Sequence, residues 1–267
     1  MEAALNKPPL LTGQYAFFFD FDGTLAKLKP HPSQVSLPDN VQYHLRKLAD
    51  LSHGALALIS GRSINELDKF TQPERYPLAG VHGAERRDIN GQQFTLSLPA
   101  NQMNAIRRKL QAALGDIDGV QIEEKPMAFA LHYRHAPGSE PLVHNCAQAI
   151  TAQYADLTLQ QGKCVVEIKP GGVNKGEAVH QFMAEPPFSG RIPVFLGDDL
   201  TDEAGFDAVN QYHGVSIKVG QEATCARWRL EDVPAVWSWL SGQVAYFEQQ
   251  RAITSRRADY ESFGRSL

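Results

Sequence analysis

The chain contains few cysteines, no long apolar run and no large excess of either charge. Only three cysteines occur in 267 residues, and none has CxxC spacing. This scarcity argues against a disulfide framework or a structural zinc site, and it suggests a reducing compartment. The formal net charge of −4 gives no reason to expect nucleic acid or an anionic membrane as a partner. No apolar stretch approaches the ~20 residues that span a bilayer, and the first residues do not resemble a signal peptide, so we expect a cytoplasmic protein.

Short apolar runs alternate with segments of helical period over much of the chain. The expected strands are residues 15–20, 55–60, 192–197 and 214–220, and the expected helices are residues 39–50, 63–70 and 201–209. Strands that are apolar on both faces and are joined by helices are typical of a parallel sheet covered on both sides. The sequence therefore predicts an α/β fold with a doubly wound parallel sheet.

The middle of the chain has a different pattern. A helix is expected at residues 101–114, two strands meeting near Pro126 follow, and a helix and a further strand come after them. One strand face is polar here, as in an α+β module with a half-exposed sheet. We expect residues 1–89 and 169–267 to form the core and residues 90–168 to form an inserted domain. The polar, basic tail from Gln249 onward is expected to fray.

The stretch FFFDFDGTL places two acids, Asp20 and Asp22, directly after a buried strand. Two carboxylates ~4 Å apart repel each other by about 4 kcal/mol at an effective dielectric of ~20. Other polar residues also follow predicted strands or begin helices: Ser60, Arg62, Lys175, Asp198, Asp199 and Asp202. Because ligands bind at the carboxyl ends of the strands in open α/β sheets, we expect these groups to converge on one crevice.

Several carboxylates in one crevice require cations. Mg²⁺ is a hard ion that prefers oxygen ligands, and Lys175 supplies a further positive charge. A phosphoryl group fits such a site, with Ser60 donating a hydrogen bond to it. Asp20 can then attack phosphorus and form an aspartyl-phosphate, while Asp22 protonates the leaving alcohol and later deprotonates water.

Each of these features alone has a simpler interpretation. Ser60 could cap the following helix, Lys175 could be a solvated surface lysine, and GDDLTDE could be a capped helix start. A lone DxD is often only a turn. Their occurrence together, in this order and at strand ends or helix starts, favours an active site.

The motifs DFDGTL, LISGR, Lys175 and GDDLTDE resemble those of the haloacid dehalogenase-like phosphatases, and they span the whole core. The insertion resembles the larger cap that covers the active site in sugar phosphatases of that group. The segments AGVHGAE (79–85), GDDLTDE and VVEIKP further resemble the trehalose-6-phosphate phosphatases. The resemblance implies a Mg²⁺-dependent hydrolase that converts trehalose 6-phosphate to trehalose and phosphate for trehalose biosynthesis. We expect this hydrolase to be a monomer.

The resemblance also implies roles for individual residues. Asp20 would be the nucleophile and Asp22 the general acid and base, with Ser60 and Lys175 completing the catalytic set. Magnesium would be held by the Asp20 carboxylate, the Asp22 main-chain carbonyl and Asp198, with Asp199 or Asp202 joining directly or through water. The expected substrate contacts are Asp20, Asp22, Ser60, Arg62 and Lys175 in the core and Glu123, Lys125 and Glu167 in the cap.

Some alternatives stay open from the sequence. Glu123 and Lys125 share one strand face and could simply form an exposed cross-strand ion pair, while His132 on the next strand is expected to be solvated. His82 and Glu85 are candidate positioning residues. The substrate could be another sugar phosphate such as sucrose 6-phosphate. The chain could also be a phosphomannomutase-like phosphotransferase or, if it does not catalyse, a sugar-phosphate sensor.

Overall fold

A computed structural model describes residues 6–29, 34–125, 127–162 and 164–264 of the chain. The chain divides into two compact units, Met1–Phe94 with Asn174–Leu267 and, inserted between them in sequence, Thr95–Val173. The sequence places the borders of the inserted domain at 90 and 168, a few residues from this division. The turn expected near Pro126 lies outside the described residues.

The first unit is built on an eight-stranded sheet with strand order β12-β11-β10-β1-β2-β3-β4-β5. The six strands from β12 to β3 are parallel to their neighbours, and β4 runs antiparallel to β3. The strands are β1 (Tyr15–Phe19), β2 (Leu56–Ile59), β3 (Leu78–Gly80), β4 (Glu85–Arg87), β5 (Gln93–Thr95), β10 (Ile192–Gly197), β11 (Val215–Val219) and β12 (Trp228–Leu230). The predicted parallel core is confirmed.

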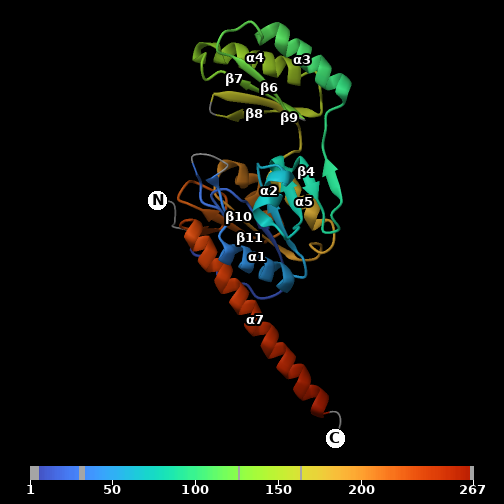
Figure 1. Cartoon of the computed structure of the whole chain (residues 1–267), viewed down its shortest axis with the longest axis vertical. Coiled ribbons are helices and arrows are strands. Elements are labelled where there is room, and N and C mark those ends of the chain that lie inside the picture. Colours follow the sequence, from blue (N-terminus) through green and yellow to red (C-terminus); the bar gives the residue numbers. More distant parts are fainter. Residues whose placement is uncertain (1–5, 30–33, 126, 163, 265–267) are drawn as a thin grey trace. The chain divides into compact units, whose positions relative to one another are not determined.

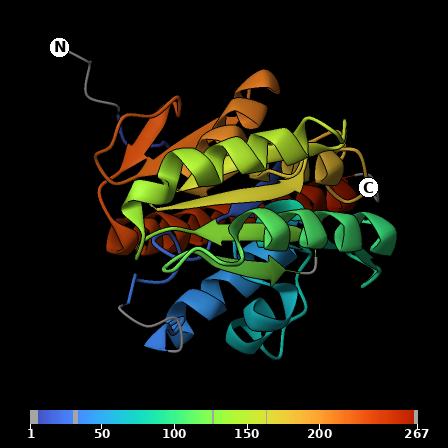
Figure 2. The ribbon, with the colours of Figure 1, turned by 90° about the horizontal axis from the view of Figure 1, so that it is seen from above.

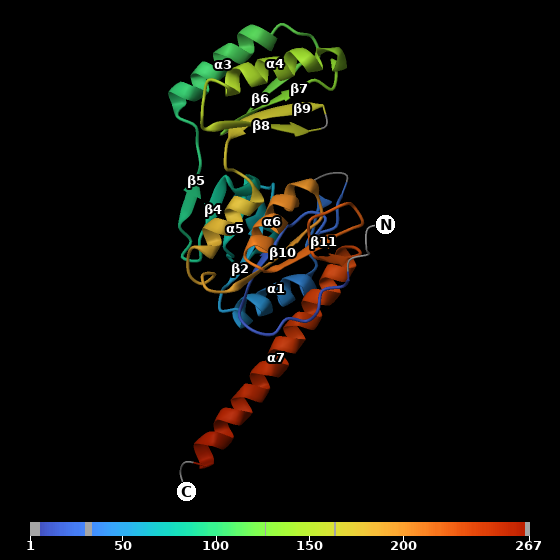
Figure 3. The same ribbon diagram turned by 180° about the vertical axis from the view of Figure 1, so that it is seen from behind.

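Strand β1 shows why this sheet is covered on both faces. Phe17 and Phe19 pack into one apolar cluster with residues of α1 (Asp39–Leu51), α2 (Ile64–Thr71) and α7 (Val233–Gly264). Phe18 packs into the opposite cluster with residues of α5 (Lys175–Met183) and α6 (Glu203–Gln211). Figure 3 shows α1 and α7 together on one side of the sheet, with α5 and α6 on the other. Because side chains alternate along a strand, a continuously apolar run fills both layers.

Helix α7 was not predicted from the sequence. Its first half buries Val236, Leu240 and Val244, which recur every four residues as expected for one helix face. The tail expected to fray from Gln249 continues as helix to Gly264 instead. The helix is visible in red in Figure 1. Among the described residues, no helix is both long and apolar enough to cross a membrane.

The second unit is a four-stranded antiparallel sheet with two helices. Its strand order is β6-β7-β9-β8, with β6 (Gln121–Lys125), β7 (Ala128–His132), β8 (Leu157–Gly162) and β9 (Val165–Pro170). Helices α3 (Ala100–Leu114) and α4 (Glu140–Thr151) lie side by side, as Figure 2 shows. Their apolar residues pack with Phe129, Leu131 and Val166 of the sheet into a single cluster. The predicted α+β character is confirmed, although β8 was not anticipated.

Candidate active site

Three predicted site residues lie where neighbouring strands end. Asp20 follows β1, Ser60 follows β2 and Asp198 follows β10. The β1 strand pairs in parallel with both β2 and β10, so the three ends lie at the same edge of the sheet. Each of the first two residues is also tied to its neighbouring strand, because the Asp20 N–H donates to the Leu196 carbonyl and the Ser60 N–H donates to the Ala79 carbonyl, both at 2.9 Å. The structure thus brings these groups together as the parallel sheet predicts.

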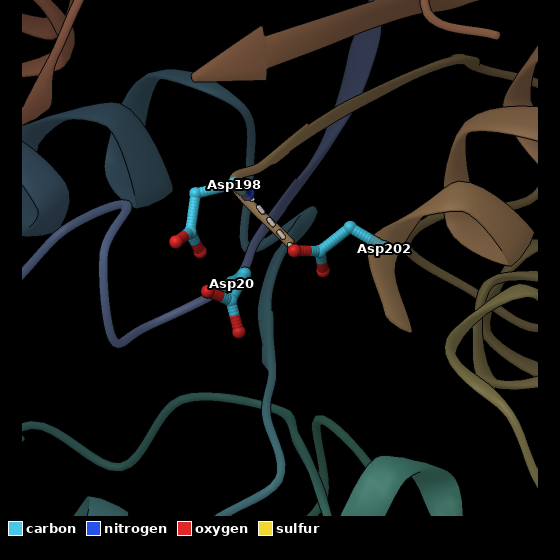
Figure 4. Close-up of side chains that lie close together, drawn as sticks. All are labelled: Asp20, Asp198 and Asp202. Carbon is cyan, nitrogen blue, oxygen red and sulfur yellow. Dashed lines mark hydrogen bonds between the residues drawn. The ribbon is translucent and has the colours of Figure 1, made fainter. Parts of the chain in front are cut away.

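The carboxylates of Asp20, Asp198 and Asp202 form a cluster at this edge, in which each offers an oxygen within 4.8 Å of the others. Figure 4 shows the three side chains close together. Burial is the main cause that raises the pKa of Asp20 and Asp198 to about 6 and that of Asp202 to about 7. Repulsion among the carboxylates adds to this effect, and Lys175 opposes it. A bound cation would stabilise the ionised form of these carboxylates.

Lys175 is the first residue of α5, and its side chain is 3% exposed. Its Nζ donates to Asp20 Oδ1 at 2.8 Å and to Asp202 Oδ1 at 2.6 Å. Burial alone would lower the pKa of Lys175, but the two carboxylates raise it above its ordinary value. Asn174 caps the helix by accepting the Glu177 N–H, which fixes where the lysine emerges. The burial of Lys175 excludes the interpretation as a solvated surface lysine.

The two acids that the sequence left open, Asp199 and Asp202, have different surroundings. The Asp199 carboxylate accepts from the Thr201 N–H at 2.8 Å and from its hydroxyl at 2.6 Å, capping η4 (Leu200–Asp202). Asp202 is fully buried, and its Oδ2 accepts the N–H groups of Asp198 at 2.9 Å and Asp199 at 3.0 Å. Asp202 therefore belongs to the cluster, whereas the metal role of Asp199 stays a prediction. The sequence carried a signal for this arrangement, because the spacing of Asp199 and Asp202 is that of a capping box.

Two glycines of the motifs make room for these carboxylates. Gly23 has φ +81°, and a Cβ there would lie 2.1 Å from Asp198 Oδ2. A Cβ on Gly197 would lie 2.3 Å from Asp202 Cγ. No side chain fits at either place, which explains the glycine in DFDGTL and the one that precedes the acids in GDDLTDE.

Asp22 does not point into the acidic cluster but pairs with Arg62. The Arg62 Nε donates to Asp22 Oδ2 at 2.5 Å and its NH2 group donates to Oδ1 at 2.7 Å, a bidentate pair. The guanidinium carbon also lies 5.0 Å from the ring centroid of Phe70. The sequence predicted both residues for the site without predicting that they bind each other. Their substrate-binding roles stay predictions.

A strained corner supports the loop that carries Ser60. Val81 and His82 have φ values of 48° and 58°. The backbone of residues other than glycine rarely adopts this region, and it is most unusual for a β-branched residue such as valine. In this conformation the Val81 N–H donates to the Arg62 carbonyl and the His82 N–H donates to the Ser60 carbonyl, both at 2.9 Å. Ser60 does not cap α2, because Ser63 does. Backbone strain of this kind is held at functional sites by the surrounding structure.

The groups of the core unit border a common cavity of about 430 Å³. Among the residues that line it are Asp20, Asp22, Ser60, Arg62, His82, Lys175 and Asp199. Apart from Asp198 and Asp202, the cavity therefore collects the core residues that the sequence names as catalytic, metal-binding or substrate-binding. Asp198 lines a neighbouring cavity instead, on the Gly23 side of the acidic cluster.

The three candidates of the inserted unit lie together on its sheet. Lys125 on β6 donates to the Glu167 carboxylate on β9, and His132 Nε2 lies 2.9 Å from Glu123 Oε2. Glu123 and Lys125 thus each form a cross-strand pair, as the simpler interpretation expects. His132, at 39% side-chain exposure, is the partner of Glu123. The register aligns Glu123, Ala130, Glu167 and Gln160 in one row across all four strands. Ala128 and Ala130 are short side chains between these charged groups.

Comparison with known proteins gives a consistent result. The family model for trehalose-phosphatase matches residues 18–234. The chain is 54% identical to the trehalose-6-phosphate phosphatase of Escherichia coli (strain K12) over 267 residues, covering 100% of both chains. The structure of Aspergillus fumigatus trehalose-6-phosphate phosphatase matches with a TM-score of 0.74 at 25% identity, covering 87% of this chain and 93% of that one. A Bacteroides thetaiotaomicron phosphatase of the haloalkanoate (HAD) superfamily shares the fold at 12% identity, with a TM-score of 0.63 and 88% and 95% coverage. The chain therefore belongs to the trehalose-phosphatase family.

Proposed function

We propose that this protein hydrolyses trehalose 6-phosphate to trehalose and inorganic phosphate. The observation that carries the proposal is the buried Asp20 at a strand end, held by Lys175 beside two further carboxylates and open to a cavity of about 430 Å³. A carboxylate nucleophile beside a buried ammonium suits phosphoryl transfer. The substrate is supported by the family and by the full-length similarity to the Escherichia coli enzyme.

The acidic cluster suits Mg²⁺. Three carboxylates, two of them buried and one half-buried, carry with one ammonium a net charge of two negative, which one divalent cation neutralises. Oxygen donors at this density are the ligands that Mg²⁺ prefers. Asp20, Asp198 and the main-chain carbonyl of Asp22 would hold it, and the position of Asp202 favours that residue over Asp199 as the third carboxylate. When bound, the ion offsets the charge of the carboxylates and of the phosphoryl oxygens.

Asp20 performs the first chemical step. Its carboxylate oxygen attacks phosphorus, a new P–O bond forms to Asp20, and the bond from phosphorus to the sugar oxygen breaks. Asp22 gives its proton to that departing oxygen and then takes one from the water that attacks the aspartyl-phosphate. Phosphate leaves, and Asp20 returns as a carboxylate. Lys175 and Ser60 donate hydrogen bonds to the transferring group.

In the pair with Arg62 both carboxylate oxygens of Asp22 accept hydrogen bonds, so the pair must open at one oxygen before Asp22 can carry the proton that the first step needs. A bidentate guanidinium holds a carboxylate in one plane more firmly than a single hydrogen bond does. The stacking of Arg62 on Phe70 fixes the guanidinium in turn. The opening that frees Asp22 also frees the Arg62 guanidinium to donate to the phosphate.

Glu123, Lys125 and Glu167 are proposed to bind the sugar. They present two carboxylates and an ammonium on one sheet face, and sugar hydroxyls can both donate to the former and accept from the latter. Ala128 and Ala130, both buried, lie between them on this face. Removal of this set should affect a disaccharide phosphate far more than a small ester.

Phosphate release from a panel of sugar phosphates tests the proposal. The panel holds trehalose, sucrose, glucose and mannose 6-phosphates, each with Mg²⁺ and again with EDTA. We expect metal-dependent release with a strong preference for trehalose 6-phosphate. Equal rates across the panel would leave the chemistry and overturn the substrate. Absence of release from every member would favour the phosphotransferase or sensor alternative.

We also propose a monomer in a reducing compartment such as the cytoplasm. Every residue that the proposed chemistry uses comes from a single chain, so no second copy is required. We expect Cys146, Cys164 and Cys225 to stay reduced in such a compartment. Light scattering that gave the mass of two chains would overturn the monomer.

A further inference from the structure

A second buried lysine lies near the acidic cluster and has no part in the chemistry above. Lys218 is 2% exposed and lies on β11, where the register pairs it with Gly197 at the end of β10. An ammonium inside a protein is unfavourable unless it is paired and hydrogen-bonded. Lys218 is not among the described residues that line the cavity beside Asp20, so substrate contact does not explain its burial.

The contacts of Lys218 point to Asp198. Its Nζ donates to the main-chain carbonyl of Asp198, and its other partner is Glu222 Oε2 at 3.4 Å. The Glu222 side chain is 72% exposed, so it is a weak, solvent-screened partner. The carbonyl of a cluster residue is therefore the main acceptor for this buried charge.

The main chain around Asp198 is consequently held from two directions. On one side, the N–H groups of Asp198 and Asp199 donate to Asp202 Oδ2 at 2.9 and 3.0 Å. On the other side, Lys218 holds the Asp198 carbonyl. With both ends of the residue fixed, only the carboxylate of Asp198 remains adjustable, and the space left by Gly23 confines it.

We propose that Lys218 is a positioning residue that holds Asp198 in the orientation needed to bind the divalent cation. This inference rests on the metal site of the proposed function. Groups that orient metal ligands without touching the metal commonly change metal affinity by about 10- to 100-fold when they are removed. The effect of Lys218 should therefore fall on metal affinity more than on the chemical step.

The test compares K218M with K218R, and E222Q is the matched control. K218M keeps the length and loses the charge, K218R keeps a charged donor, and E222Q removes only the exposed partner of the lysine. The melting temperature of each protein is measured in EDTA and then during a Mg²⁺ titration. Isothermal titration with Mg²⁺ and turnover at saturating Mg²⁺ complete the comparison.

We expect K218M to raise the Mg²⁺ concentration at half effect about 10-fold or more, with turnover largely recovered at saturating Mg²⁺. K218R should restore most of the affinity, and E222Q should stay within about 2-fold of the wild type. A folded K218M with wild-type Mg²⁺ affinity would overturn the role of Lys218, as would an equal loss in E222Q.

Two further outcomes are distinguishable. If K218M does not fold, K218Q is measured instead, since its amide retains a neutral donor and its affinity for Mg²⁺ should still fall. An unchanged affinity in K218Q would overturn the proposal. If the wild-type protein shows neither a thermal shift nor heat with Mg²⁺, the metal site of the proposed function fails, and the role of Lys218 fails with it.

Discussion

The ion pairs at the candidate sites of the two units differ in how deeply they are buried. In the first unit, Lys175, Asp20 and Asp202 have side chains that are 3%, 6% and 0% exposed, at the edge of a parallel sheet covered on both faces. In the second unit, Lys125 and Glu167 are 36% and 24% exposed on an antiparallel sheet with helices packed against it. Both sets are ion pairs, but only one lies in a low-dielectric environment.

This difference teaches what each set can do. A buried carboxylate has a shifted pKa and a fixed position, which suits bond formation. A half-exposed pair is screened by water and contributes little to folding, so it can exchange its partners for ligand hydroxyls. We therefore expect changes in the first unit to remove turnover and changes in the second to alter substrate preference.

The largest expected effect is that of D20N. The amide cannot form the acyl-phosphate, so turnover of every phosphate ester should fall by about 10⁴-fold or more. Folding should be retained, because the substitution removes a buried charge and Lys175 keeps Asp202 as its partner. Steady-state phosphate release and circular dichroism check this. A rate within 100-fold of the wild type would contradict the assignment of the nucleophile.

The next effect should come from A130L, which places a large side chain between Glu123 and Glu167. We expect kcat/KM for trehalose 6-phosphate to fall by about 10-fold or more, because the added bulk occupies the proposed sugar site. Turnover of a small ester such as p-nitrophenyl phosphate should be retained. Parallel losses on both substrates would mean that Ala130 only packs the sheet, and the comparison of units would lose its support.

A smaller effect is expected for E167Q. Loss of the carboxylate removes a proposed charged hydrogen-bond partner of the sugar, so the ratio of rates on trehalose 6-phosphate and p-nitrophenyl phosphate should fall about 10-fold. E124Q is the matched control, since Glu124 pairs with Arg107 and lies opposite Phe129 on the helix-covered side of the sheet. If the ratio of rates on the two substrates were equal in E167Q and E124Q, a role of Glu167 in sugar binding would be contradicted.

The smallest effect is a pH dependence of stability in the metal-free protein. The pKa values of Asp20, Asp198 and Asp202 are raised to about 6 to 7 by burial, against about 3.9 when unfolded. Between about pH 4 and pH 7 the folded state therefore binds more protons, and the three groups lower the free energy of unfolding as pH rises.

Mg²⁺ should reverse this loss, because it binds the carboxylates that protons otherwise occupy. The increase in melting temperature on adding Mg²⁺ should be a few degrees larger at pH 8 than at pH 5. Because each pH supplies its own EDTA reference, other titrating groups largely cancel. An increase that is equal at the two pH values would show that the cluster does not titrate in this range.

Several elements could be predicted from the sequence because their signals are local. The runs YAFFFD, ALALIS and IPVFLG are long enough to specify strands, and their polar ends specify one edge of a parallel sheet. The helix stripe of Met103, Ile106, Leu110 and Leu114 is buried as its spacing predicts. Helix α7 carried a comparable spacing in Val236, Leu240 and Val244 and could have been found.

The sequence by itself determined which residue types meet at the site, because the ends of the apolar runs, the glycines and the charged residues can all be identified from the order of residues. Only the tertiary structure decided their partners. Arg62 pairs with Asp22, Lys218 donates to the Asp198 carbonyl, and Lys125 donates to Glu167. The structure also places Asp202 rather than Asp199 in the acidic cluster. These contacts join positions from different strands and helices. Side-chain direction and burial decide between nearby carboxylates, and both arise only when the elements pack.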